Sequence, residues 1–102
     1  MKNMVIIIHA GAQQDLADML RSLEQVRGFT FNHVEGHGTQ AAQDPFLSAR
    51  DKVVGYVPRV RVDILLDDEH VKTVLGALRD PEKGVGGKGI FWITAVENDG
   101  RL

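Results

Sequence analysis

The sequence predicts one α+β domain with a four-stranded antiparallel sheet and two helices on one of its faces. Three observations predict this fold: four short segments are typical of strands, two segments have the period of an amphipathic helix, and each helix lies between two strands along the chain. The chain has 102 residues, of which 43% are hydrophobic and 25% are charged, as expected for a single globular domain. We therefore treat residues 1–102 as one unit.

The chain begins with a predicted strand and a predicted helix. Residues 4–8 are apolar and mostly β-branched, and small residues at 10–12 follow them, which indicates a buried strand. From Gln13 onward the apolar residues recur with helical spacing. Gly28 fits the position just past the helix end, where a positive φ is often needed. The apolar stripe of this helix consists of Leu16, Met19, Leu20, Leu23 and Val26.

A second strand is predicted over residues 29–36, where apolar and polar residues alternate. The stretch from Gly36 to Pro58 then shows neither period, and a loop of this length inside a small domain is usually functional. Alternation resumes in residues 59–66, which we interpret as the third strand. One face of this strand carries the apolar side chains Val60, Val62, Ile64 and Leu66.

The last part of the chain is predicted to form a helix and a fourth strand. Asp67 or Asp68 is suited to cap the helix, and Pro81 is suited to end it. A glycine-rich stretch, residues 83–89, leads into a strand over residues 90–96. The order of the elements matches the ferredoxin-like βαββαβ plan. The apolar stripe of the second helix consists of Val71, Val74, Leu75 and Leu78.

In this plan the face of the sheet away from the helices has no cover within the chain. Several of its positions, Val60, Val62 and Ile64 or their partners on neighbouring strands, are apolar, so a bare face would expose a hydrophobic patch. We therefore predict a closed homo-oligomer in which the copies cover this face.

Composition excludes several classes of function. The formal net charge of -2 argues against a nucleic-acid partner, and the absence of cysteine excludes disulfides and thiolate metal sites. The longest apolar run, Met4–Ile8, is far shorter than the roughly 20 residues of a membrane span, so we expect a cytoplasmic protein with no membrane insertion. The two serines, Ser22 and Ser48, stand in no nucleophile motif, and we predict no catalytic residues and no enzyme activity.

Three features favour a negatively charged ligand. The first is the glycine-rich segment 36–40, the second is segment 83–89 with Lys83 and Lys88, and the third is the pair Arg59 and Arg61 on one strand face. Glycine allows backbone N–H groups to converge on an anion, and lysine and arginine add charge and hydrogen bonds for phosphate. The alternative is that these glycines only form turns between strands and helices.

Histidine spacing leaves a metal site open as an alternative. His33 and His37 lie four residues apart near the end of a strand, where they could share a metal ion with His9.

Three segments together resemble the PII signal-transduction superfamily, whose members are trimeric ferredoxin-like proteins that sense nucleotides and small metabolites. Gly28-Phe29-Thr30 leading into 34–40 is similar to the start of the family's T-loop, and 56–62 is similar to its end. Residues 86–92 are similar to the glycine-rich B-loop and the strand after it. The resemblance places a T-loop at about 38–57, a B-loop at about 83–89 and a short C-terminal tail at 97–102.

The resemblance implies a homotrimer with an adenine nucleotide in the cleft between neighbouring subunits. ADP or AMP is the expected nucleotide, with ATP as a further candidate, and no permanently bound cofactor is required. Binding is expected to order residues 39–57 and so to change the surface that a partner meets. The residues implied in nucleotide binding are Thr30, Gly36, Gly38, Thr39, Gln40, Arg59, Gly87, Lys88, Gly89 and Arg101.

Within the superfamily the short tail and the Gly-Lys-Gly-Ile-Phe-Trp stretch resemble PII-like offshoots. Resemblance to the carboxysome-associated PII-like group implies bicarbonate as a second ligand and a membrane transporter of inorganic carbon as partner. The alternative is the group found with heavy-metal efflux systems, related in fold to CutA, which implies a metal-responsive module using His33 and His37.

Overall fold

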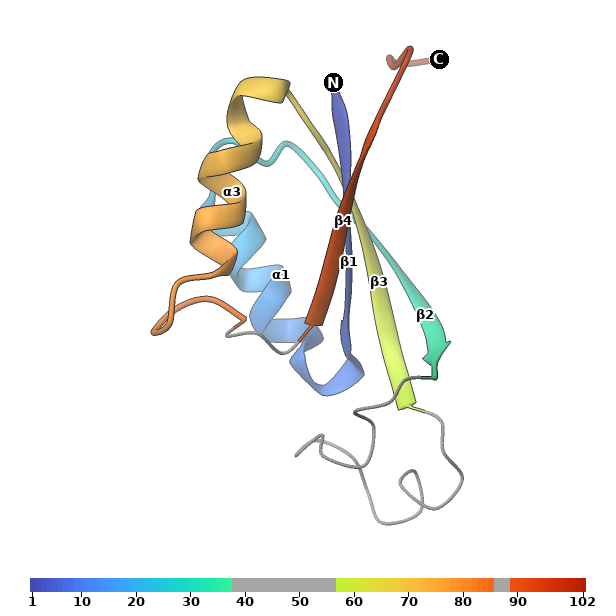
Figure 1. Cartoon of the computed structure of the whole chain (residues 1–102), viewed down its shortest axis with the longest axis vertical. Helices are drawn as coiled ribbons and strands as arrows, with labels where there is room; N and C mark the ends of the chain where they lie inside the picture. Colours follow the sequence, from blue (N-terminus) through green and yellow to red (C-terminus); the bar gives the residue numbers. More distant parts are fainter. Residues whose placement is uncertain (38–56, 86–88) are drawn as a thin grey trace.

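A computed structural model describes residues 1–37, 57–85 and 89–102 of the chain. It confirms the predicted α+β, ferredoxin-like fold: the four strands form one antiparallel sheet, and helices α1 and α3 pack on one of its faces (Figure 1). In chain order the elements are β1 (Lys2–His9), the 3₁₀ turn η1 (Ala10–Ala12), α1 (Gln13–Ser22), β2 (Thr30–Gly36), β3 (Val57–Leu66), the 3₁₀ turn η3 (Asp68–His70), α3 (Val71–Leu78) and β4 (Gly89–Ala95).

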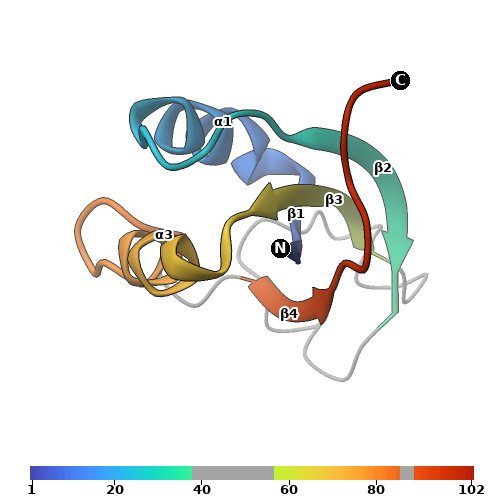
Figure 2. The same cartoon turned by 90° about the horizontal axis from the view of Figure 1, so that it is seen from above.

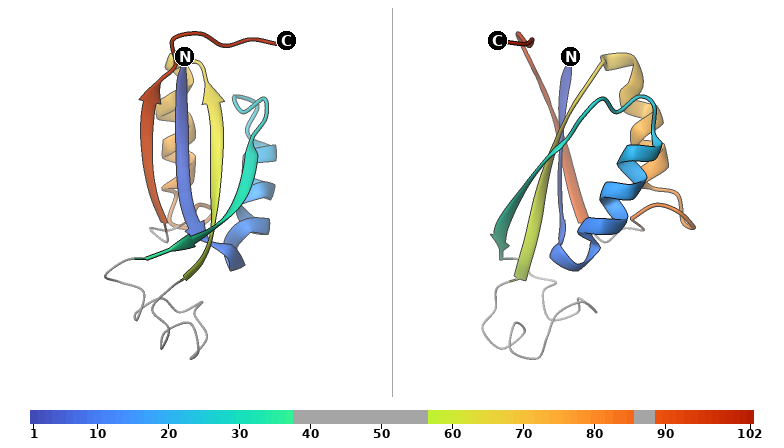
Figure 3. Two further views of the ribbon diagram at one scale, coloured as in Figure 1. Left: turned by 90° about the vertical axis from the view of Figure 1, so that its right-hand side faces the viewer. Right: turned by 180° about the vertical axis from the view of Figure 1, so that it is seen from behind.

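The strands lie in the order β2-β3-β1-β4, so that β1 and β3 are central and β2 and β4 form the two edges (Figure 3). Ile6 of β1 stands opposite Val62 of β3 and Phe91 of β4, and Val62 in turn stands opposite Phe31 of β2. Because side chains alternate along a strand, this register assigns every second residue of all four strands to the same face.

The hydrophobic core lies between the sheet and the two helices (Figure 2). The predicted apolar face of the third strand is confirmed, because its four side chains are at most 1% exposed. They face the helices, so the expectation that the uncovered face includes Val60, Val62 and Ile64 is wrong. The core consists of Met4, Ile6, Ile8, Ala12, Leu16, Leu20, Val60, Val62, Ile64, Leu66, Val74 and Leu78.

The first helix is shorter than its apolar stripe predicts. It ends at Ser22, whose hydroxyl donates to the carbonyl of Met19 at 2.6 Å, and Leu23 has extended backbone angles. Leu23 and Val26 still pack against the core, but from a turn in which the Val26 amide donates to the Leu23 carbonyl. Gly28 is therefore not the residue after the helix, as the stripe had suggested.

The second helical segment begins with the 3₁₀ turn η3. Asp67 precedes this turn, but its side chain makes no capping hydrogen bond, contrary to the sequence prediction. The Asp67 carboxylate instead accepts from the Arg27 guanidinium at 2.8 Å. Helix α3 ends at Leu78, before Pro81. None of the helices in the part of the chain that the structure describes is long and apolar enough to cross a membrane.

Within residues 1–37, 57–85 and 89–102, no helix lies over the second face of the sheet, as predicted (Figure 3). The register places Val5, Leu65, Ile90 and Trp92 on this face, which we call the open face. Val5 is buried, but Leu65, Ile90 and Trp92 are 49%, 62% and 40% exposed. The open face therefore presents large apolar side chains to its surroundings.

Candidate functional site

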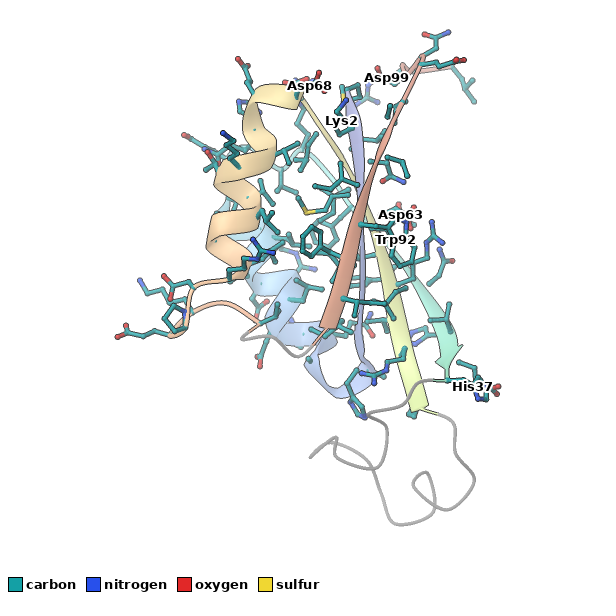
Figure 4. The ribbon with its side chains drawn as sticks, viewed as in Figure 1. Lys2, His37, Asp63, Asp68, Trp92 and Asp99 are labelled. Carbon is teal, nitrogen blue, oxygen red and sulfur yellow. The ribbon has the colours of Figure 1, made fainter. Side chains whose placement is uncertain are left out.

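The structure does not bring all of the predicted nucleotide-binding residues together. Gly36, Arg59 and Gly89 lie at one end of the sheet, where β2 ends and β3 and β4 begin. Thr30 begins β2 and stands level with Asp63 and Val5, in the middle of the sheet, whereas Arg101 lies next to the C-terminus, which Figure 1 shows beyond the opposite end. We call the end with Gly36 the loop end; His37 marks it in Figure 4, and Asp99 marks the opposite end. Five further predicted residues lie outside the described part of the chain: Gly38, Thr39, Gln40, Gly87 and Lys88.

At the loop end, the side chain of Arg59 lies across the backbone of Gly36. A Cβ atom placed on Gly36 would stand 2.7 Å from Cγ, 3.5 Å from Cδ and 3.3 Å from Nε of Arg59. Arg59 stands opposite Val34 in the register, so Gly36 is its diagonal neighbour on the same face of the sheet. Glycine at position 36 therefore leaves the space that the arginine stem occupies.

Gly89 occupies the other edge of the sheet at the same end. It pairs with Ile8, and a Cβ atom on it would stand 2.5 Å from the carbonyl oxygen of Ile7. Two strands, β3 and β1, separate Gly89 from Gly36. With neighbouring strands about 4.8 Å apart, the two glycines are at least about 14 Å from each other across the sheet, and Gly89 stands level with Val60 rather than with Val57, the partner of Gly36.

The loop that leads from α3 toward residues 86–88 is held by Asp80. The Asp80 carboxylate accepts from the backbone N–H groups of Glu82 and Lys83, at 2.8 and 3.0 Å, and these bonds lower the pKa of Asp80. The amide of Gly84 donates to the Asp80 carbonyl, and the amide of Val85 donates to the Leu78 carbonyl. The first half of the predicted B-loop therefore has a defined backbone, with Lys83 exposed on it.

A small cavity of about 60 Å³ opens beside this loop. Its volume is far below the roughly 300 Å³ at which pockets for larger small molecules begin, so we do not expect a nucleoside to enter it. The cavity lies between the start of the first helix and the loop after the second. Its lining residues are Gly11, Ala12, Asp15, Met19, Lys83, Gly84 and Val85.

Arg61, the second arginine of the predicted pair, is directed to an acidic partner on the open face. Its Nε donates to Asp63 at 2.8 Å and its terminal nitrogen at 3.1 Å, while its guanidinium lies 5.8 Å from the centre of the Trp92 ring. Asp63 and Trp92 stand at the same level of the sheet, on either side of Val5 in β1 (labelled in Figure 4). The bonds from Arg61, with one from Asn3 at 3.1 Å, lower the pKa of Asp63. Arg59, and not Arg61, is therefore the arginine beside the predicted T-loop base.

The structure places the three candidate histidines in different surroundings. His37 lies 3.1 Å from the Glu35 carboxylate through Nε2, and both side chains are exposed. The register places His33 on the helix-covered face of the sheet, whereas it places His9 on the open face, opposite Arg59. Nδ1 of His9 accepts from the amide of Gly11 at 2.9 Å, so this nitrogen is not available to a metal in the present arrangement.

Sequence reasoning missed one group of potential metal ligands. Asp67, Glu69 and His70 have ligand atoms within 4.8 Å of one another, and they form the one such group of three within residues 1–37, 57–85 and 89–102. Arg27 already pairs with the Asp67 carboxylate there, and acidic side chains near the start of a helix are common without a metal. The sequence signal that could have revealed this group is that its three residues lie within four positions of one another. We assign the group no function.

Comparisons with known proteins support a relationship with PII regulators. A family described as "Protein of unknown function (DUF3240)" matches residues 2–102. The chain is 28% identical over 85 residues to a nitrogen regulatory protein P-II of Rhizobium meliloti, covering 80% of this chain and 76% of that protein. It is 26% identical over 103 residues to nitrogen regulatory protein P-II 2 of Methanothermobacter thermautotrophicus, covering 100% and 89%.

A solved structure supports the fold. The crystal structure of a DUF3240 family protein from Shewanella baltica superposes with a TM-score of 0.76 at 21% identity, covering 99% of this chain and 94% of that chain. At this identity the likeness supports the architecture alone.

Proposed function

Because the chain belongs to the DUF3240 family and is related to the P-II regulators, we propose that it is a regulatory sensor rather than an enzyme, and that it binds an adenine nucleotide between copies of itself. ADP or AMP is the proposed nucleotide, with ATP as a further candidate. The proposed assembly is a homotrimer, and the nucleotide is a reversible ligand rather than a permanent cofactor.

The separation of Gly36 and Gly89 is the observation that carries this proposal. Both lie at the loop end, but on opposite edges of the sheet, with two strands between them. One phosphate chain cannot contact both edges of the same sheet, because they are at least about 14 Å apart. A second copy whose β4 edge lies beside the β2 edge of the first would bring the two glycine segments together. The binding cleft is therefore proposed to lie between copies.

The open face supplies the second support. A closed ring of copies would cover Leu65, Ile90 and Trp92, which a lone chain exposes. Arg61 and Asp63 already neutralise each other on this face, so covering them leaves no unpaired charge from this pair. A homotrimer satisfies both requirements, and the relationship with the P-II regulators favours it.

The proposed signal passes through residues 38–57 to a protein partner. A nucleotide at Gly36 and Arg59 touches the two ends of this segment, so its binding free energy can select one conformation of it. We further propose bicarbonate as a second ligand and a membrane transporter of inorganic carbon as the partner, in the cytoplasm. These finer assignments rest on the resemblance to the carboxysome-associated PII-like group.

Calorimetric titration of the purified protein tests the proposal. ADP, AMP and ATP are titrated separately, each with and without bicarbonate, and the mass of the assembly is measured in the same buffer. We expect one nucleotide per chain in an assembly of three chains. Titrations without heat for all three nucleotides, confirmed by equilibrium dialysis, would overturn the nucleotide-sensor proposal.

A metal-responsive module is the second candidate. It is favoured by the contact of His37 with Glu35, which presents a nitrogen and a carboxylate at the loop end on exposed side chains. Equilibrium dialysis against zinc and copper, repeated with His33→Ala and His37→Ala combined, tests it. Stoichiometric metal binding that the double variant abolishes would favour this candidate, and equal binding by both proteins would remove these histidines from the site.

A further inference from the structure

His9 is the last residue of β1 and lies at the loop end of the sheet. The residue is 6% exposed, and within the described parts of the chain it is the one buried residue with a polar or ionisable side chain. Nδ1 accepts a hydrogen bond from the backbone amide of Gly11 at 2.9 Å. A nitrogen that accepts from an amide carries no proton, so in this arrangement the ring is the neutral form protonated at Nε2. The bond fixes the ring against the turn that follows the strand.

His9 stands directly opposite Arg59 in the pairing of β1 with β3. Directly opposed residues of antiparallel strands have Cβ atoms about 4.5–5.5 Å apart on one face of the sheet. On its other side Arg59 lies across Gly36, whose missing side chain provides the space. The arginine stem therefore lies toward β2, over the backbone of Gly36, and His9 is its cross-strand neighbour on the β1 side.

We propose that His9 is a positioning residue that directs the Arg59 guanidinium toward the phosphate of the bound nucleotide. This inference rests on the nucleotide-binding function proposed above. The Gly11 amide holds the His9 ring, and Gly36 leaves space for the Arg59 stem on the β2 side. In this proposal the held ring, as the cross-strand neighbour of Arg59, keeps the stem from turning toward β1. An arginine held in this way loses less side-chain freedom when it binds a phosphate, and its fork-shaped donors meet the anion with less reorganisation.

Two substitutions separate positioning from simple capping of the turn. In His9→Asn the shorter side chain can still accept from the amide two residues later, as asparagine commonly does in turns, but it has no ring beside Arg59. In His9→Phe a ring of similar size remains, but the acceptor for Gly11 is lost. If His9 only caps the turn, His9→Asn behaves like the wild type, and only His9→Phe is impaired.

The first measurement needs no ligand. Nitrogen relaxation of the Arg59 Nε–H group reports the order of its side chain, with Lys72→Ala on the outside of α3 as control. We expect His9→Asn to lower this order while the urea midpoint stays near the wild-type value. Unchanged order of Arg59 in His9→Asn would overturn the proposal, whether or not the protein binds a nucleotide.

The second measurement is a double-mutant cycle of ADP affinity with Arg59→Ala. We expect His9→Asn to weaken binding about tenfold in the wild type and not at all in Arg59→Ala, because His9 acts through Arg59. Equal losses in both backgrounds would overturn the proposal. A wild type that binds no nucleotide, but whose Arg59 order depends on His9, would refute the proposed function and retain the positioning role.

Discussion

The backbone of Gly89 lies against the carbonyl group of Ile7, so closely that a Cβ atom on Gly89 would stand 2.5 Å from the carbonyl oxygen. The neighbouring atom belongs to backbone in the central strand of the sheet, which cannot turn aside as a side chain can. We therefore expect Gly89→Ala to destabilise the protein by about 1–3 kcal/mol, as overpacking of a well-packed site does. Urea unfolding followed by circular dichroism measures this loss.

Gly76 provides a matched control for this substitution. It lies within α3, is exposed, and has no atom within 4 Å of where its Cβ would stand. Gly76→Ala should therefore stabilise the protein by up to about 1 kcal/mol, because alanine is the better helix former. Equal midpoints for the two alanine variants would show that the contact with Ile7 does not limit position 89.

The Arg61–Asp63 pair predicts a pH dependence of stability on the acid side. Hydrogen bonds from Arg61 lower the pKa of Asp63 in the folded protein. The pair therefore contributes stability above the unfolded carboxyl pKa of about 3.9, and this contribution is lost as pH falls through the lower folded pKa. Asp63→Asn should have a lower urea midpoint than the wild type near pH 6. The difference between the two midpoints should become smaller as the pH falls below 4.

Asp18, an exposed carboxylate of α1, provides the control for this titration. Asp18→Asn should lose as much stability as the wild type when the pH falls below 4, whereas Asp63→Asn should lose less. If Asp63→Asn instead shows the full acid-side loss of the wild type, the pair has no part in it. Both Arg61 and Asp63 are about one third exposed, so the effect is expected to be modest.

Periodicity predicted the strands well because a strand with one buried face shows its alternation directly. Val60, Val62 and Ile64 were assigned to one face because side chains alternate along a strand, and all three are fully buried. The alternation does not indicate whether the helices cover this face or the other one. These residues were therefore wrongly expected on the open face. The end of α1 was missed because Val26 reaches the core from a turn as well as it would from a helix.

The candidate site was only partly predictable, because its contacts depend on strand register. Gly36 and Arg59 were each singled out from the sequence, but their contact follows only once Arg59 is known to stand opposite Val34. His9 was considered solely as a metal ligand. Its bond to Gly11 requires a turn directly after the strand, and its neighbour Arg59 lies fifty residues later in the sequence.

Trp92 tests the proposed assembly through the open face. It is 40% exposed there, and replacing it with glutamate would place an unpaired charge in any interface that covers the face. Trp92→Glu should therefore reduce the molar mass in light scattering from three times that of the 11.2 kDa chain to that of one chain.

Phe91 provides the control because it precedes Trp92 but faces the helix side, with Arg79 5.1 Å from its ring centre. Phe91→Ala should weaken folding and leave the mass of the assembly unchanged. A wild-type protein that is monomeric at micromolar concentration would contradict the trimer. A Trp92→Glu variant that stays trimeric would show that the interface lies elsewhere.

Lys88 tests the phosphate-binding role that the sequence assigns to the glycine-rich loop. A lysine that meets a phosphate makes a charge-assisted hydrogen bond, whose loss costs about 1.5–3 kcal/mol. Lys88→Ala should therefore weaken ADP binding by a factor of about ten or more, and the remaining affinity should depend less on salt, because one ionic contact is gone. Lys72→Ala, at an exposed position near the start of α3, removes the same charge and should leave the affinity unchanged. Calorimetry at two salt concentrations measures both effects, and equal weakening by the two variants would mean that overall charge, rather than a contact at Lys88, attracts the nucleotide.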